Sequence, residues 1–266
     1  MGRPKTVLVT GASSGIGKAT AKLLAADGNV VFGTSRFRRR NNHKFRMLKF
    51  DANSDSSADE CISEFLKEAG HIDVLVNNAG TMSIGAIEEF SIAAAKQQFE
   101  TNFFGVARMV KAVLPHMRRQ RHGSIINVGS LAGTFPVPFE GYYSASKAAL
   151  YAYSEALHNE LKEFNIRVSV VEPGFFKTRI LDNSNLADRR LACYNETKGR
   201  VISKMHYATE NGQDPHLVAE AIVGIVESTR PNFRYVVGYQ GRYLKFKRVI
   251  PDEVMVYFLR KYWMGK

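Results

Sequence analysis

Two adjacent tyrosines and a lysine stand in the segment YYSASK, which covers residues 142–147. A tyrosine hydroxyl can donate or accept a proton, but its ordinary pKa of about 10 is high for acid–base catalysis at neutral pH. A nearby lysine ammonium favours the tyrosinate and lowers that pKa. Lys147 lies four residues after Tyr143, so a helix would place both on one face, whereas Tyr142 would be turned away by a further ~100°. The spacing therefore predicts Tyr143 and Lys147 as an acid–base pair.

A glycine-rich turn, TGASSGIG, covers residues 10–17 and directly follows an apolar run. Gly11 suits a tight turn, Gly15 lets the backbone approach a pyrophosphate, and Gly17 allows a helix to pack closely on a sheet. The N–H groups and the positive dipole end of a helix that begins here would bind phosphate. The turn therefore predicts a dinucleotide site formed by Gly11, Ser13, Ser14, Gly15, Ile16 and Gly17.

The elements that must position these residues follow an alternating order. Apolar runs rich in Val and Ile predict strands at 6–10, 30–34, 47–50, 73–77, 124–128, 167–171 and 235–238. Helical patterns lie near 16–26, 56–69, 91–120, 142–164 and 214–229. Continuous apolar runs are typical of strands buried on both faces, and the alternation implies right-handed crossovers. We predict a single α/β domain over residues 1–266, doubly wound, with helices on both faces of a mostly parallel sheet.

A long insertion at 175–212 breaks this alternation. It contains Phe175, Phe176 and Leu181 among other apolar residues, and loops of this length are usually functional or disordered. We expect a partly ordered lid.

The C-terminal extension, at about 241–266, ends in PDEVMVYFLRKYW. Pro251 suits the start of a helix, and Val254, Tyr257 and Phe258 would share one face of it. We expect this helix to pack on the protein itself. Contact of its basic and aromatic residues with an anionic membrane surface is the less favoured alternative.

The net charge of +12 is concentrated in two segments. Residues 36–46 carry six Lys or Arg and no acid, and residues 242–266 carry seven basic and two acidic residues. A nucleic-acid interface usually spreads its charge over a face, so we expect no nucleic-acid partner. Cys61 and Cys193 are expected to be free thiols, as in a cytoplasmic protein. No apolar run approaches the ~20 residues needed to span a bilayer.

The end of the second predicted strand favours one cofactor over another. An NAD site generally has an acidic residue there, which holds the ribose 2′-hydroxyl. This sequence has Ser35 and Arg36 instead. Arg36 can bind a 2′-phosphate through charge-assisted hydrogen bonds, with Arg38 as an assistant. The residues therefore favour NADP(H).

Three motifs in order, TGASSGIG, NNAG (77–80) and YSASK (143–147), resemble the short-chain dehydrogenase/reductase family. The resemblance covers about residues 5–240, and at Arg36 it matches the NADP-preferring members. It implies a Rossmann-type fold with a seven-stranded sheet, which agrees with the seven predicted strands.

The resemblance also implies roles for single residues. It implies a catalytic set of Asn102, Ser130, Tyr143 and Lys147. In this set Ser130 would hold a carbonyl oxygen, and Asn102 would hold a water that links Lys147 to solvent. Besides Arg36, Tyr143 and Lys147, the implied cofactor contacts are Asp51, Asn78, Ala79, Gly80, Pro173, Gly174 and Thr178. No metal site is expected.

Apolar residues surround the predicted acid–base pair in the sequence. The segment LAGTFPVPFEGY separates Ser130 from Tyr143. Two interpretations stay open, a substrate pocket and ordinary packing between loops. For the pocket, the expected contacts are Ser130, Phe135, Phe139, Tyr143 and Leu181. A steroid, retinoid or other lipid-like carbonyl compound would suit such a pocket.

The leading hypothesis is an NADP(H)-dependent oxidoreductase that interconverts a ketone or aldehyde and an alcohol. The alternatives are a 3-oxoacyl-thioester reductase and a non-catalytic NADP-binding regulatory protein. The helical segments at 91–120 and 142–164 are where this family commonly forms its dimer or tetramer, so a homo-oligomer is expected. The expected location is cytoplasmic, with peripheral membrane contact as the alternative.

Overall fold

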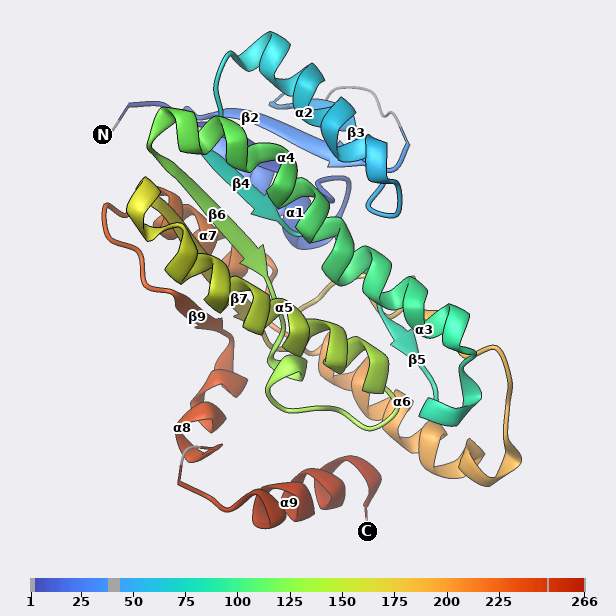
Figure 1. Ribbon diagram of the computed structural model, residues 1–266. Helices are drawn as coiled ribbons and strands as arrows, with labels where there is room; N and C mark the ends of the chain where they lie inside the picture. Colours follow the sequence, from blue (N-terminus) through green and yellow to red (C-terminus); the bar gives the residue numbers. More distant parts are fainter. Residues whose placement is uncertain (1–2, 38–43, 248, 266) are drawn as a thin grey trace.

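The computed structural model describes residues 3–37, 44–247 and 249–265 (Figure 1). Its centre is a seven-stranded sheet with the order β3-β2-β1-β4-β6-β7-β9, in which every neighbouring pair is parallel. The strands are β1 (Thr6–Val9), β2 (Val30–Ser35), β3 (Arg46–Lys49), β4 (Val74–Asn77), β6 (Gly123–Val128), β7 (Ile166–Pro173) and β9 (Arg234–Val237). This arrangement confirms the predicted doubly wound α/β fold.

Helices cover both faces of the sheet (Figure 1). One face packs on α1 (Gly15–Ala26) and α7 (His216–Glu227). The other packs on α2 (Asp55–Ala69), α4 (Gly105–Gln120) and α5 (Gly141–Glu160).

The strands supply both cores because successive side chains point to opposite faces. In β1, Val7 and Val9 belong to the core under α1 and α7, whereas Leu8 belongs to the core under α2, α4 and α5. All three side chains are fully buried, as the continuous apolar run predicts.

The predicted helix at 91–120 is interrupted. It consists of α3 (Ile92–Phe99), a π-helical turn (Glu100–Phe104) and α4. Asn102 lies in the middle of the π-helical turn and is fully buried. Such wider turns are rare in proteins and are often found at functional sites.

The predicted lid contains regular structure. Within it, β8 (Asn185–Leu186) pairs with the short strand β5 (Ser83–Ile84), and a 3₁₀ turn at Ala192–Tyr194 leads into α6 (Asn195–Glu210).

One carboxylate holds the lid to a 3₁₀ turn at Ile87–Glu89. Glu89 is fully buried and accepts hydrogen bonds from the backbone N–H of Leu191 at 2.8 Å and from the ammonium of Lys198 at 2.6 Å.

The C-terminal extension consists of a 3₁₀ turn (Tyr239–Arg242), α8 (Tyr243–Lys247) and α9 (Asp252–Met264). Helix α9 packs on α6, but not through the predicted face. Trp263 is the buried residue of α9, whereas Val254, Tyr257 and Phe258 are 42%, 55% and 57% exposed. The apolar pattern therefore predicted the helix correctly and its buried face incorrectly. Within the described part of the chain, no helix combines the length and the apolar character needed to cross a membrane.

Candidate active site

The predicted site residues gather at the carboxyl edge of the parallel sheet. The glycine-rich turn follows β1, the NNAG segment follows β4, and Ser130 follows β6. The order of the strands reverses between β1 and β4, and this kind of switch point forms a crevice at the carboxyl edge where ligands bind.

The glycine-rich turn packs against the NNAG segment without room for side chains. Gly11 has a φ of +67°, and a Cβ atom there would lie 2.9 Å from the Cα atom of Ala79. A Cβ atom at Gly17 would lie 2.6 Å from the backbone oxygen of Gly11. The Thr10 hydroxyl joins the two segments, because it accepts hydrogen bonds from the backbone N–H groups of Asn78 at 2.9 Å and Ala79 at 3.0 Å.

The start of α1 is exposed and has no side-chain cap. Gly15, with a φ of +53°, is the first residue of the helix and is exposed. Ser14 precedes it, is exposed, and makes no side-chain capping bond. Ser13 is half-buried, and Ile16 packs on the core under α1 and α7. The first N–H groups of a helix have no partners within the helix, so they can bind a phosphate here.

The segment PGFFKT, which covers residues 173–178, lies next to this turn. Pro173 ends β7, and the backbone N–H of Gly174 donates to the carbonyl of Val237 at 3.0 Å. The methyl group of Thr178 lies 3.9 Å from the position that a Cβ atom would take on Gly15. Residues that are far apart in the sequence thus lie on both sides of one crevice.

The far end of the crevice carries the predicted cofactor-selecting residue. Arg36 is exposed directly after β2, and its guanidinium lies 6.0 Å from the ring centroid of Phe37. No acidic side chain of residues 3–37, 44–247 or 249–265 pairs with it. Asp51 follows β3 and accepts a hydrogen bond from the backbone N–H of Asn53 at 3.1 Å. Arg38 lies outside the described residues.

Tyr143 and Lys147 lie on α5 and are both buried. The Lys147 ammonium donates to the backbone carbonyl of Val128 at 2.8 Å and lies 6.0 Å from the centroid of the Tyr143 ring. A Cβ atom on Gly80 would lie 3.7 Å from the same ammonium, so the NNAG segment reaches the predicted catalytic residues. Ser130, at the end of β6, accepts from the backbone N–H of Ala132 at 3.1 Å.

Burial controls the ionisation of this pair. It raises the pKa of Tyr143, a hydrogen bond with Ser130 opposes that rise, and the charge of Glu140 adds to it. Burial also lowers the pKa of Lys147 to about 8. Burial is thus the largest influence on the pKa of Tyr143 in this arrangement, in which the Lys147 ammonium donates to the carbonyl of Val128.

The amide of Asn102 is held by protein partners. Its Oδ1 atom accepts from the backbone N–H of Thr81 at 2.8 Å. Its Nδ2 atom donates to the carbonyl of Thr81 at 2.9 Å and to the hydroxyl of Ser146 at 3.1 Å. Both amide hydrogens are therefore used, and the side chain retains only acceptor capacity for the water that the resemblance implies.

An apolar cluster surrounds Tyr143 and contains two of the predicted substrate residues, Phe139 and Leu181. Its other buried members are Met82, Ile84, Ala132, Val137, Val201, Met205 and Trp263. Phe135 is not part of this cluster. It lies instead below the ammonium of Lys247 in α8, 5.5 Å from the ring centroid.

Sequence reasoning missed several residues at this site. Trp263 reaches the cluster from the end of α9, and its ring lies 5.8 Å from that of Phe175 in the lid. Ser146 lies inside the YSASK motif but was assigned no role. Tyr142 is half-buried and packs edge-on against Phe90, with 5.6 Å between the ring centroids, so its role in this structure is packing.

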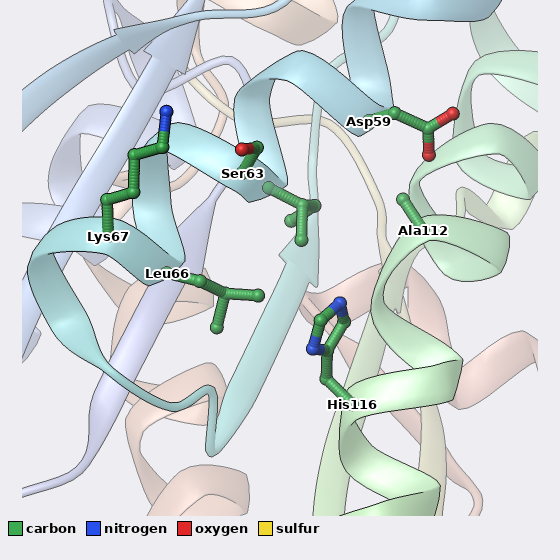
Figure 2. A pocket seen from close by; sticks show the side chains of 7 residues that line it. Asp59, Ser63, Leu66, Lys67, Ala112 and His116 are labelled. Carbon is green, nitrogen blue, oxygen red and sulfur yellow. The ribbon is translucent and has the colours of Figure 1, made fainter.

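A surface depression between α2 and α4 contains none of these residues (Figure 2). It is lined by Asp59, Ile62, Ser63, Leu66, Lys67, Ala112 and His116. All of these residues lie on α2 and α4, and none of them is a predicted site residue, so the depression is separate from the site.

The site geometry agrees with the comparison to known protein families. A family model described as "short chain dehydrogenase" matches residues 5–189. The chain belongs to the short-chain dehydrogenase family. This dehydrogenase is therefore an oxidoreductase of a family that uses a nicotinamide cofactor. The glycine contacts around residues 11–17 and the open start of α1 fit a dinucleotide.

Relatives of this short-chain dehydrogenase include two curated proteins. A 3-ketodihydrosphingosine reductase from Bacteroides thetaiotaomicron is 41% identical and is covered over 98% of each chain. Retinol dehydrogenase 8 from Homo sapiens is 37% identical over 87% of this chain and 80% of its own length. Among solved structures, a short-chain dehydrogenase from Streptomyces avermitilis is 30% identical, with a TM-score of 0.83 over 97% of this chain and 96% of the other.

Proposed function

We propose that this dehydrogenase interconverts a ketone and an alcohol on an apolar, lipid-like substrate, with NADP(H) as cofactor and Tyr143 as the acid–base residue. The observation that carries the proposal is the buried Tyr143 hydroxyl, which interacts with Ser130 and lies within an apolar cluster at the carboxyl edge of the sheet. An apolar cavity with a few polar groups is the usual form of a small-molecule site.

The cofactor preference rests on Arg36. It is exposed at the end of β2, it has no acidic partner among the described residues, and no acid occupies the end of that strand. A guanidinium in this place favours a 2′-phosphate over a 2′-hydroxyl.

The chemistry follows from the residues around Tyr143. The hydride for the carbonyl carbon would come from a nicotinamide held in the crevice beside these residues. Ser130 holds the carbonyl oxygen, and Tyr143 gives that oxygen its proton. Because burial raises its pKa, Tyr143 stays protonated and is ready to act as an acid in the reducing direction. Lys147, with a pKa lowered to about 8, can gain and lose a proton near neutral pH, which suits restoring the proton of Tyr143.

The substrate class is supported by the cluster and by the relatives. The lid and α9 contribute Leu181, Val201, Met205 and Trp263, so apolar side chains from three parts of the chain meet at Tyr143. The names of the two curated relatives refer to a sphingoid ketone and to retinol, which are both long apolar molecules.

A panel of carbonyl compounds tests this proposal through the absorbance of NADPH. The panel contains 3-ketodihydrosphingosine, all-trans-retinal, a steroid ketone and an acetoacetyl thioester. Turnover of one of the first three is expected. Turnover of the thioester alone would support the 3-oxoacyl-thioester reductase instead, and turnover of none would support the regulatory protein.

We also propose that α9 makes peripheral contact with an anionic membrane surface from a cytoplasmic location. Val254, Phe258 and Tyr262 form an exposed stripe at a spacing of four residues, and Arg260 and Lys261 are exposed beside it. An exposed aromatic stripe flanked by basic residues is typical of an interfacial helix. The same helix carries Trp263 into the substrate cluster, so a lipid substrate would have a short path from the membrane.

A homo-oligomer is proposed through α3, α4 and α5. Ile92 and Phe104 are large apolar residues that are 66% and 46% exposed. Together with Phe99 and Tyr142 they line an apolar depression. A second copy of the chain would cover this surface. A monomer in analytical ultracentrifugation at micromolar concentration would contradict the proposal.

A further inference from the structure

The carboxyl group of Glu140 is buried near Tyr143, the proposed acid–base residue, and one of its oxygens has no partner among the described residues. Glu140 is the residue that precedes the first turn of α5, and it is 2% exposed. Its Oε1 atom accepts no hydrogen bond from the described residues. Burying a carboxyl group without a hydrogen-bond partner costs free energy. A bound ligand could supply the partner that the described residues do not.

Glu140 is the residue just before α5, and Tyr143 lies in the first turn of that helix. They are three residues apart, a spacing that brings side chains together on a helix. The two groups also influence each other: after burial and the opposing hydrogen bond with Ser130, the charge of Glu140 is a further cause of the raised pKa of Tyr143. An ionised Glu140 disfavours the tyrosinate, so a carboxylate here hinders the exchange of the tyrosine proton unless a positive charge offsets it.

No cation among the described residues offsets the negative charge of an ionised Glu140. Burial raises the pKa of Glu140 to about 8, and neither an opposite charge nor a hydrogen bond from residues 3–37, 44–247 or 249–265 counteracts that rise. Lys147 is buried on the same helix, but it donates to the carbonyl of Val128.

We propose that Glu140 binds the protonated amino group of a substrate in which the carbon next to the carbonyl carries that amino group. The inference rests on the proposed function, and it narrows the substrate class to long-chain 2-amino ketones and the corresponding amino alcohols. With the carbonyl oxygen at Tyr143, a substituent on the neighbouring carbon would reach the start of α5, where Glu140 lies. The ammonium would pair with the buried carboxylate and also offset its effect on Tyr143.

Two observations favour an ammonium over another ligand. The surroundings of Glu140 are apolar, since Phe139 and Val137 next to it in the chain belong to the cluster around Tyr143, and a charge-assisted bond is strong in such surroundings. In addition, the 3-ketodihydrosphingosine in the name of the relative from Bacteroides thetaiotaomicron is a long-chain ketone with an amino group on the adjacent carbon. A neutral Glu140 that donates a hydrogen bond to a substrate hydroxyl is the competing interpretation.

The experiment compares two substrates that differ only in the amino group. The kcat/KM values are measured for 3-ketodihydrosphingosine and for the same ketone with hydrogen in place of the amino group. The wild-type protein, Glu140→Gln and Glu140→Asp are compared, with Glu155→Gln as a matched control because Glu155 is an exposed carboxylate on the same helix. The Gln variant removes the charge and keeps the shape and the capacity to donate a hydrogen bond.

The expected result is a change in the preference between the two substrates. A charge-assisted bond contributes roughly 1.5–3 kcal/mol, so Glu140→Gln should lower the ratio of kcat/KM for the amino ketone over its analogue by about 10- to 100-fold, mainly through KM. Glu140→Asp should restore part of the ratio, and Glu155→Gln should leave it unchanged. Equal losses on both substrates would mean a structural role, and an unchanged ratio would support the neutral hydrogen-bond donor. Either result overturns the proposal.

A second measurement uses only the wild-type protein, so it tests the proposal even if the Glu140 variants fail to fold. The wild-type KM values for the amino ketone, its N-acetyl derivative and the analogue without nitrogen should rank the amino ketone lowest by about tenfold or more. Equal KM values would overturn the role of Glu140 while leaving the ketone reductase intact. If the wild-type protein reduces none of the three, the proposed function itself fails.

Discussion

The side chain of Asn102 donates a hydrogen bond of 3.1 Å to the hydroxyl of Ser146, which donates at 2.7 Å to the backbone carbonyl of Tyr143. Asn102 lies in the π-helical turn before α4, and the other two residues lie on α5. These two bonds therefore join the π-helical turn to α5, the helix that carries the proposed acid–base tyrosine. The same amide binds both backbone polar groups of Thr81, so three segments are held in one arrangement.

Tyr143→Phe should abolish turnover and leave NADPH binding intact. General acid–base catalysis contributes about 10²–10⁴-fold, and the variant lacks the only group proposed to donate the proton. Turnover and NADPH fluorescence check this. Tyr142→Phe is the matched control, and it should retain most activity because the ring still packs on Phe90. Near-normal turnover in Tyr143→Phe would refute the assignment.

Arg36→Ala should weaken NADPH binding and leave NADH binding nearly unchanged. A charge-assisted bond to the 2′-phosphate contributes roughly 1.5–3 kcal/mol, which corresponds to a loss of about 10- to 100-fold in affinity. Titration calorimetry with both cofactors measures the difference. Arg230→Ala serves as the control, since Arg230 is exposed between α7 and β9. Equal losses for both cofactors would count against the phosphate role.

The stability of the ligand-free protein should fall between about pH 5 and pH 8 through Glu140. Its pKa of about 8 in the folded protein exceeds the ordinary value of 4.5, so the folded state keeps a proton that the unfolded state has lost. This contribution is complete below about pH 4.5 and disappears as the pH rises through 8. One pKa unit is ~1.4 kcal/mol, so the change amounts to a few kcal/mol.

Urea unfolding of the wild-type protein and Glu140→Gln across this pH range measures the effect. The difference between the two free energies of unfolding should change with pH, because only the wild-type protein has the titrating group. Glu155→Gln should run parallel to the wild-type protein, since Glu155 is exposed. A difference independent of pH would show that Glu140 does not titrate in this range.

Glu89→Gln should loosen the lid. Its buried carboxylate accepts bonds from Ala86, Leu191 and Lys198, so the change leaves the Lys198 ammonium, which is mostly buried, without its counter-charge. Breaking a buried ion pair in this way costs about 3–5 kcal/mol.

Limited proteolysis of residues 187–200 and the KM of the substrate report the loosening. Glu196→Gln is the control, because the Glu196–Arg200 pair is solvent-exposed at 3.4 Å and contributes at most about 1 kcal/mol. Proteolysis at the wild-type rate in Glu89→Gln would contradict the importance of this tie.

Phe258→Glu should reduce binding to vesicles that contain anionic lipid. Phe258 is 57% exposed on α9, so the change costs little in folding but places a negative charge on the proposed membrane face. Co-sedimentation with anionic and with neutral vesicles measures the binding, which should weaken as salt increases. Leu217→Glu on α7 is the control, because Leu217 is an exposed apolar residue on another helix. Binding of the wild-type protein to neither vesicle would contradict the membrane contact.

Much of the fold could be predicted because its signals are local. The apolar runs of β1 and β4 show burial on both faces, and Gly11 and Gly17 lie at positions where a Cβ atom would overlap neighbouring backbone. The spacing of Tyr143 and Lys147 is likewise a property of one helix. The π-helical turn at Asn102 could not be predicted, because the residues on either side have ordinary helical patterns and the interruption depends on contacts with Thr81 and Ser146.

The order of strands and helices could be derived from the amino-acid sequence alone, and so could two predictions about the site: a phosphate-binding turn at residues 10–17, and Tyr143 rather than Tyr142 as the acid–base residue. These inferences depend on the spacing of residues along the chain, which can be read directly from the amino-acid sequence. The tertiary structure was needed to show that Trp263 belongs to the apolar cluster around Tyr143, that Phe135 lies outside it, and that the Oε1 atom of Glu140 has no partner among the described residues. Such facts depend on which distant segments meet, because burial and pairing of a side chain are set by neighbours remote in sequence.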